Sequence, residues 1–290
     1  MIVVVGSYNV DFLIKVRDFP SEGETVFSDG VYIDHGGKGS NQAVSASRLG
    51  GNVRLISAVG NDEFGKRAIK FWEDERLDVA YVKIKNALTG SAYIVFDRRG
   101  RNFIVVNRGA NALLSEDDLD GCLNGDILLT QLEVNENVVK KALKEFPGVK
   151  VLNPAPAVLN DNSLLEYVDI LTPNEIEFKE LTGTQDLNYG IAVSYTHLTL
   201  PTTAASDVYK RQAYIGTRER RILIPTLAVD AIDTTGAGDV FNASLAVYLE
   251  KGYSLERAVR ISNIISAYST TRIGALGPRL SEVSELIEKE

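Results

Sequence analysis

Residues 233–246 have the sequence DTTGAGDVFNASLA, a turn of small residues followed at once by an apolar helix pattern. Small residues let a ligand approach the backbone closely, and the first N–H groups of a helix have no partner inside it. The helix dipole adds positive partial charge at the same end. The stretch therefore predicts a site for a phosphate or a developing anion at residues 236–238. Asp239 follows in the first helical turn, either as a helix cap or as a functional carboxylate.

The chain before this stretch alternates between short β-branched runs and amphipathic segments. Strands are expected at 2–5, 53–59, 126–130, 149–152 and 168–171, and helices at 39–49, 62–77, 135–146 and 174–181. Alternation of this kind predicts an α/β fold with a mostly parallel sheet sandwiched by helices. Ligands of such sheets bind beyond the carboxyl ends of the strands.

Two stretches interrupt the alternation. Residues 11–34 and 89–107 contain strand-like runs and turn signals but no helix pattern. We expect them to form a small β-sheet lid on a single α/β domain that spans residues 1–290, although decorated loops are the alternative. The edges of an exposed sheet need cover, so two lids are expected to pair in a homodimer.

Composition excludes several classes of protein. The chain has 290 residues and a formal net charge of −8, which argues against nucleic acid as a partner. No apolar run approaches the ~20 residues of a membrane span. Cys122 is the single cysteine, so no intramolecular disulfide is possible. We therefore expect a soluble, cytoplasmic protein.

Further motifs follow predicted strands. Residues 36–43 read GGKGSNQA and enter the first long helix, and residues 6–11 read GSYNVD directly after the first strand. The first motif is either a glycine-rich turn with a solvated lysine or a site that recognises hydroxyl groups. The second is either an Asx turn or a pair of side chains that grip the same ligand. Glu133 follows another strand.

Two motifs have plausible structural roles as well. Asn174 and Glu177 lie three residues apart at a predicted helix start, where Asn174 could simply cap the helix. Residues 269–275, STTRIGA, end a long apolar helix pattern, and Gly274 could simply stop it.

These motifs, in this order, resemble the signatures of the ribokinase-like (PfkB) carbohydrate kinase family. The resemblance runs from residue 2 to about residue 190 and from about residue 213 to the end. It implies a ribokinase-like fold and ATP-dependent phosphorylation of a small sugar at its primary hydroxyl, with D-ribose and D-ribose 5-phosphate as the first expectation. It also implies Mg²⁺ and a monovalent cation such as K⁺.

The resemblance assigns roles to individual residues. Asp239 would be the catalytic base, with Gly236, Ala237 and Gly238 as the anion hole. The sugar would be bound by Asn9, Asp11, Gly37, Lys38, Asn41, Glu133 and Asp239. The nucleotide and its Mg²⁺ would lie near Asn174, Glu177 and Asn263. The monovalent cation would be held by the stretch formed by Asp233, Thr235, Ser269, Arg272 and Gly274.

Residues 192–212, AVSYTHLTLPTTAASDVYKRQ, do not fit this pattern. They lack a clear period and carry Pro201 in the middle, and a compact domain should not need such a long structureless stretch. The resemblance implies a helix, a strand and a nucleotide loop here. We expect an irregular segment and suspect a sequence artefact, with a genuine divergent loop as the alternative. Another sugar or nucleoside kinase of the family, or a sugar-binding protein with an impaired nucleotide site, remain alternative functions.

Overall fold

The architecture is a central eight-stranded sheet with helices on both faces and a smaller sheet at one end. The computed structural model describes residues 1–186, 202–207, 212–217 and 221–289. The central strands lie in the order β14-β13-β12-β11-β10-β9-β1-β4. Pairing is parallel from β12 to β4, and antiparallel between β12 and β13 and between β13 and β14. The prediction of a mostly parallel sheet is confirmed.

The central sheet is built from eight short strands. They are β1 (Ile2–Val5), β4 (Val53–Ile56), β9 (Ile127–Gln131), β10 (Val149–Asn153), β11 (Ile170–Leu171), β12 (Thr202–Asp207), β13 (Gln212–Thr217) and β14 (Arg221–Pro225).

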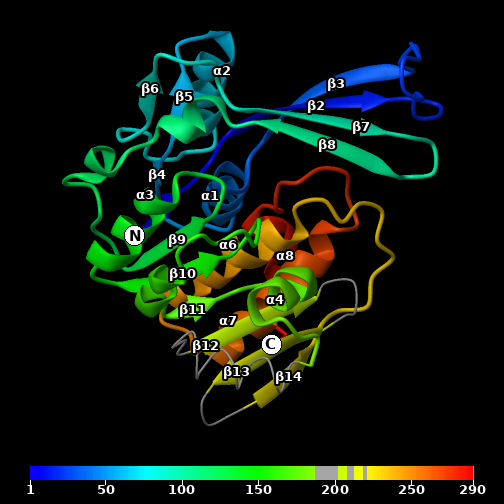
Figure 1. Ribbon diagram of the computed structural model, residues 1–290. Helices are drawn as coiled ribbons and strands as arrows, with labels where there is room; N and C mark the ends of the chain where they lie inside the picture. Colours follow the sequence, from blue (N-terminus) through cyan, green and yellow to red (C-terminus); the bar gives the residue numbers. More distant parts are fainter. Residues whose placement is uncertain (187–201, 208–211, 218–220, 290) are drawn as a thin grey trace.

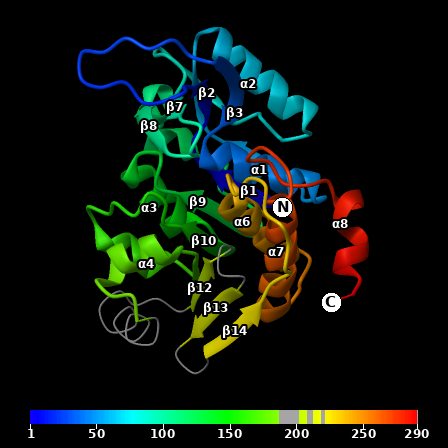
Figure 2. The same cartoon turned by 90° about the vertical axis from the view of Figure 1, so that its right-hand side faces the viewer.

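Helices cover both faces of this sheet. They are α1 (Lys38–Arg48), α2 (Glu63–Asp74), α3 (Glu136–Glu145), α4 (Glu175–Thr182), α6 (Ala237–Glu250), α7 (Leu255–Ser269) and α8 (Leu280–Ile287), with 3-10 turns η1 (Gly109–Leu113), η2 (Glu116–Leu119) and η3 (Asn162–Tyr167). Figure 2 shows α1, α6, α7 and α8 on one side of the sheet, and α3 and α4 on the other. Among the described residues, no helix is long and apolar enough to cross a membrane.

Strand β1 shows why both faces are covered. Its four residues are all apolar and fully buried. Alternate side chains of a strand point to opposite faces. Ile2 and Val4 accordingly pack into the core under α1, α6 and α7, whereas Val3 and Val5 pack into the core under α3.

The smaller sheet, hereafter the lid, contains β2 (Asn9–Lys15), β3 (Gly30–Gly36), β7 (Ser91–Phe96) and β8 (Asn102–Asn107). Its strand order is β3-β2-β7-β8, so β3 and β8 are the edges. Figure 1 shows the lid projecting from one end of the molecule. Apolar side chains on both edge strands are exposed, among them Val31, Phe103 and Val105. The predicted lid is present, and its strands extend to Asn9 and Gly36, beyond the predicted limits.

Two stretches differ locally from the predicted structure. The single strand expected at 53–59 is divided into β4 and β5 (Ala58–Gly60), because the chain leaves the central sheet at Ser57 and pairs with β6 (Lys83–Lys85) instead. The segment 192–212 was expected to be irregular, yet Thr202–Asp207 forms β12, which pairs with β11 and β13. The remainder of that segment lies outside the described residues, apart from Gln212, the first residue of β13.

Candidate active site

Asp239 lies in the first turn of α6 and is buried, with 6% of its surface exposed. Its Oδ2 accepts a hydrogen bond from Asn41 Nδ2 at 3.2 Å, and its Oδ1 accepts one from Gln42 Nε2 at 2.9 Å. A carboxylate that capped the helix would accept from a backbone N–H of α6, but Asp239 accepts from side chains of α1. Its geometry therefore favours the functional interpretation over the cap.

The turn before Asp239 leaves the start of α6 without a side-chain cap. Gly236 is the N-cap residue with φ of 72°, a left-handed conformation that favours glycine. A Cβ on Gly236 would lie 2.3 Å from the carbonyl oxygen of Ala275, whereas a Cβ on Gly238 would meet none of the described residues within 4 Å. The start of the helix thus combines N–H groups, the positive end of the dipole and open space, which suits an anion.

The positive charge of Lys38 interacts with three carboxylates that the sequence predicted to belong to the site. The pKa of Lys38 is raised, first by the negative charge of Asp239 and then by Glu133 and Glu177, although burial opposes the shift. These three carboxylates come from α6, from the loop after β9 and from α4. The ammonium group therefore stays charged at neutral pH among the groups that were predicted to bind the sugar, the phosphate and the metal.

The lid contributes Asn9 and Asp11 from β2. Gly37 has φ of 86°, and a Cβ there would lie 2.7 Å from the backbone nitrogen of Asn9, so only glycine allows α1 to start this close to the lid. The Asn9 Oδ1 accepts a hydrogen bond from Asn111 Nδ2 at 3.0 Å. Burial raises the pKa of Asp11 to about 7, and the charges of Glu133, Asp34 and Asp239 add to the effect. The Asp11 carboxyl is therefore partly protonated near neutral pH and could both donate to and accept from hydroxyl groups.

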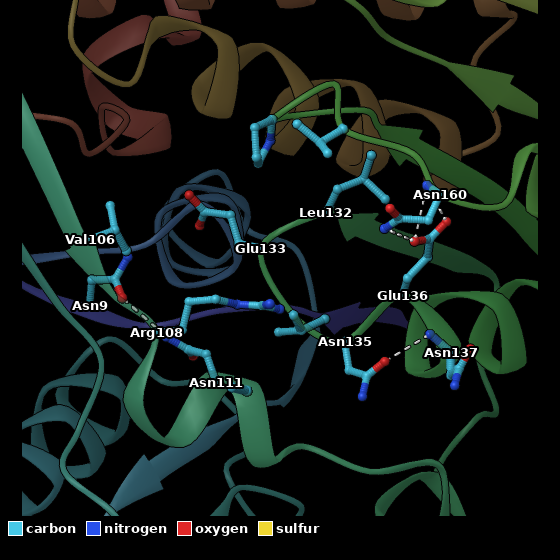
Figure 3. Close-up of a pocket in the computed structure, with 14 residues that line it drawn as sticks. Asn9, Val106, Arg108, Asn111, Leu132, Glu133, Asn135, Glu136, Asn137 and Asn160 are labelled. Atoms are coloured by element: carbon cyan, nitrogen blue, oxygen red, sulfur yellow. Dashed lines mark hydrogen bonds between the residues drawn. The ribbon is translucent and has the colours of Figure 1, made fainter.

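Glu133 is fixed on the other side of the site. Its Oε2 accepts hydrogen bonds from the Ser7 hydroxyl and, at 2.9 Å, from the backbone N–H of Lys38. Figure 3 shows Glu133, Asn9 and Arg108 around one pocket, with Arg108 between the lid and the loop after β9. The pocket has a volume of about 630 Å³. A ligand in this pocket could contact several of the lining residues in addition to Glu133.

Asn174 and Glu177 form a reciprocal capping box at the start of α4. The Glu177 N–H donates to Asn174 Oδ1 at 2.9 Å, and the Asn174 N–H donates to Glu177 Oε2 at 2.8 Å. The structural role considered for Asn174 is thus confirmed. Burial raises the pKa of Glu177, with Asp239 adding to the effect and Lys38 opposing it. A role of either residue toward nucleotide or metal stays a prediction.

Among the residues predicted to hold a monovalent cation, Asp233 is hydrogen-bonded to two of the others. Asp233 accepts from the N–H groups of Thr235 and Gly274, both at 2.9 Å. These bonds lower the pKa of Asp233 although burial opposes the shift. The Ser269 hydroxyl instead donates to the Ser266 carbonyl, and the Arg272 guanidinium donates to Glu282 and to Tyr268.

Asn263 is predicted to lie beside adenine, and it lies in α7 with its amide turned to the sheet. Its side-chain Nδ2 donates to the backbone carbonyl of Ile224 at 3.1 Å, and its backbone carbonyl accepts from Thr226 Oγ1 at 2.8 Å. The two bonds join α7 to β14 and to the residue that follows it. This arrangement supplies a structural role for Asn263 and leaves its nucleotide contact a prediction.

Comparison with known proteins decides the family. Residues 1–281 match the pfkB family carbohydrate kinase. The chain belongs to this family. It is similar to the ribokinase of Haemophilus influenzae, with 35% identity over 99% of this chain and 98% of the relative. It is also similar to the deoxyribokinase of Salmonella typhi, with 31% identity over 99% of this chain and 98% of the relative.

A solved structure of this family has the same fold. The Arabidopsis thaliana ribokinase complexed with ribose and ATP superposes with a TM-score of 0.91 and 28% identity, over 99% of this chain and 98% of that chain. The predictions of a ribokinase-like fold and of an ATP-dependent carbohydrate kinase are confirmed.

Several residues of this family member had no predicted role. Gln42, Gln131 and Asn153 are buried at the edge of the site and bond to one another or to Asp239. Gln42 lies within the motif of residues 36–43, and Gln131 and Asn153 directly follow the predicted strands at 126–130 and 149–152, so the sequence indicates that they lie near the site. Their partners are not visible in the sequence, because each partner comes from a different strand or helix.

Proposed function

We propose that the chain catalyses ATP-dependent phosphorylation of D-ribose at its primary hydroxyl, giving D-ribose 5-phosphate. The observation that carries the proposal is the position of Asp239, which contacts the sugar-binding candidate Asn41 and lies in the first turn of the helix whose N-terminus suits a phosphoryl group. The names of the ribokinase relatives support ribose as the substrate. Intact Asp239 and Gly236–Gly238 argue against a protein that only binds sugar.

The residues suggest how the transfer would proceed. Asp239 takes the proton from the primary hydroxyl as that oxygen attacks the γ-phosphorus of ATP and the bond to ADP breaks. The N–H groups at the start of α6 stabilise charge on the transferred phosphoryl group. Lys38, held charged by Asp239, offsets negative charge between the sugar and the phosphates.

Mg²⁺ and a monovalent cation belong to the same proposal. Mg²⁺ usually keeps several waters and is bound through phosphates and one or two carboxylates. The described residues contain no cluster of three or more His, Cys, Asp and Glu that could hold a metal, which agrees with a metal that arrives with ATP. Glu177 would orient its water shell, and the metal would neutralise phosphate charge. Asp233 and Gly274 would border the monovalent cation.

Sugar selectivity provides the test against 2-deoxyribose, the substrate that the name of the Salmonella typhi relative suggests. A buried polar site that loses one hydroxyl partner loses about 1–3 kcal/mol. Calorimetric titration should therefore give a Kd for ribose at least about tenfold below that for 2-deoxyribose. Equal affinities, or tighter binding of fructose or a nucleoside, would contradict ribose as the substrate.

We also propose a homodimer formed through the lid, and a cytoplasmic location where ATP is available. The lid has two edge strands that expose Val31 and Phe103, with 53% and 62% of their surfaces accessible. Pairing two lids would cover these apolar groups and close the sugar sites. Light scattering at micromolar concentration should give about twice the 31.7 kDa mass of one chain. A monomeric mass would count against the pairing.

A further inference from the structure

Gln42 is the most deeply buried group that contacts Asp239. Gln42 has no exposed surface, whereas Asn41, the second side chain on this carboxylate, retains 7%. The bond from Gln42 Nε2 to Oδ1 is 2.9 Å, and the bond from Asn41 Nδ2 to Oδ2 is 3.2 Å. The two oxygens of Asp239 are thus held differently, one from inside the protein and one by a residue predicted to contact sugar.

The orientation of the Gln42 amide is determined by its partners. A carboxylate only accepts hydrogen bonds, so the NH₂ group of Gln42 must face Asp239. The second N–H of this group donates to Asn153 Oδ1 at 3.1 Å, and Gln42 Oε1 accepts from Gln131 Nε2 at 2.5 Å. Gln131 is fully buried, and a Cβ on Gly6 would lie 2.3 Å from its Oε1. Gln42 therefore has all of its amide groups engaged and little freedom to turn.

The same chain of bonds reaches the anion-hole turn. Asn153 Nδ2 donates to the Thr172 carbonyl at 3.2 Å, and Thr172 Oγ1 donates to Asn242 Oδ1 at 2.6 Å. Asn242 Nδ2 then donates to the Gly238 carbonyl at 2.9 Å. Asn153, Thr172 and Asn242 are each at most 6% exposed. A single buried network therefore runs from the carboxylate to the turn that would receive the phosphoryl group.

We propose that Gln42 is a positioning residue for the transfer step, which holds Oδ1 of Asp239 in the buried network and leaves Oδ2 to take the proton of the sugar hydroxyl. The inference rests on the proposed function, because it needs Asp239 to act as the base. A hydrogen bond donated to a carboxylate favours its ionised form. The loss of this hydrogen bond should therefore be visible in the pH dependence of the rate.

Charged groups around Asp239 come from three other elements. Lys38 at the start of α1 carries the opposite charge, whereas Asp11 on β2 and Glu177 on α4 carry the same sign. Gln42 is neutral, so its replacement by methionine changes no charge in this group. Any change in the pH dependence of such a variant then reports the lost hydrogen bond.

The test compares pH–rate profiles of the purified full chain and Gln42→Met, with saturating ribose and ATP. We expect the acid limb of kcat to move up by about one pH unit, a tenfold change in the proton concentration at half-maximal rate. The KM for ribose should change less than kcat, because Gln42 is fully buried and is not among the residues predicted to bind the sugar. Ser57→Ala is the matched control, since Ser57 is equally buried, and among the described residues its hydroxyl has no hydrogen-bond partner and makes no bond to Asp239. Its profile should match the wild type.

Gln42→Glu is the second variant, in case the methionine variant does not fold. A carboxylate at this position would face Asp239 with the same charge, so the acid limb should move up further than in Gln42→Met. An acid limb that stays in place in a folded variant, even with a lower Tm, would overturn the role of Gln42 and leave it a structural residue. A wild-type chain that does not phosphorylate ribose, or whose acid limb persists in Asp239→Asn, would contradict the proposed function instead.

Discussion

Replacing Asp239 with asparagine is expected to lower kcat for ribose phosphorylation by about 100- to 10,000-fold, the usual contribution of a general base. The variant should still fold. An asparagine can accept from Gln42 through Oδ1 and present its NH₂ group to Asn41. The Oδ1 of Asn41 has no hydrogen-bond partner in the part of the chain that the structure describes, so that amide can turn and accept. Steady-state kinetics with calorimetric titration of ribose will separate turnover from binding.

Asp11→Asn is the matched control for this variant. Asp11 is also a partly buried carboxylate, but it lies on the lid strand β2. Within the described residues, no hydrogen bond joins it to Asp239. If it only binds sugar, its replacement should raise the KM for ribose more than it lowers kcat. A folded Asp239→Asn chain with near-normal kcat would remove Asp239 from the mechanism. A loss of kcat in Asp11→Asn as large as in Asp239→Asn would mean that the two roles had been assigned incorrectly.

The sequence allowed the parallel sheet and the candidate residues to be predicted together, for one physical reason. Strands of a parallel sheet end at the same edge, so polar residues that follow different strands converge there. Asn9 was predicted on this basis, whereas the roles of Glu133 and Asn174, which also follow strands, came from the resemblance to the family. Glycine motifs added information because Gly37 and Gly236 adopt positive φ, which few other residues tolerate.

The errors have a physical cause as well. Apart from the partly buried Arg54, the residues of Val53–Ile56 and Ala58–Gly60 are apolar or small and are buried, so the change of sheet at Ser57 leaves no trace in hydropathy. Strand β12 forms through backbone pairing with β11 and β13, which the local sequence of residues 202–207 does not predict. The network around Gln42 was not predicted because a glutamine has no preference for one partner. Its bonds depend on helices and strands that meet only in the folded chain.

The artefact proposed for residues 192–212 stays a prediction. The strand at 202–207 shows that this part of the chain is compatible with the central sheet, and says nothing of nucleotide affinity. Sequencing the gene across codons 192–212 addresses the origin of the segment directly. Poor ATP binding by the 290-residue chain, in contrast to normal ribose binding, is the result that the artefact predicts.

Gly236 and Gly238 are two residues apart, and replacing each by alanine is expected to have different effects on thermal stability, while both replacements reduce activity. At Gly236 the φ of 72° costs an alanine about 1–2 kcal/mol, and its Cβ would also lie 2.3 Å from the Ala275 carbonyl oxygen. Each kcal/mol lowers the Tm of a chain of this size by about 2–4 °C, so Gly236→Ala should melt several degrees below the wild type. Its activity should fall because the whole turn is displaced.

At Gly238 an added Cβ would meet no atom of the structurally described chain within 4 Å, and alanine favours a helix over glycine by about 1 kcal/mol. Gly238→Ala should therefore keep or slightly raise the Tm. Its methyl group would nevertheless enter the space at the helix start where the phosphoryl group is expected, and kcat/KM for ATP should fall at least about tenfold. Thermal melts and ATP kinetics of the two variants provide the measurement. If Gly238→Ala were fully active, the open space beside it would not be the phosphoryl site, and the anion hole would have to lie elsewhere along the turn.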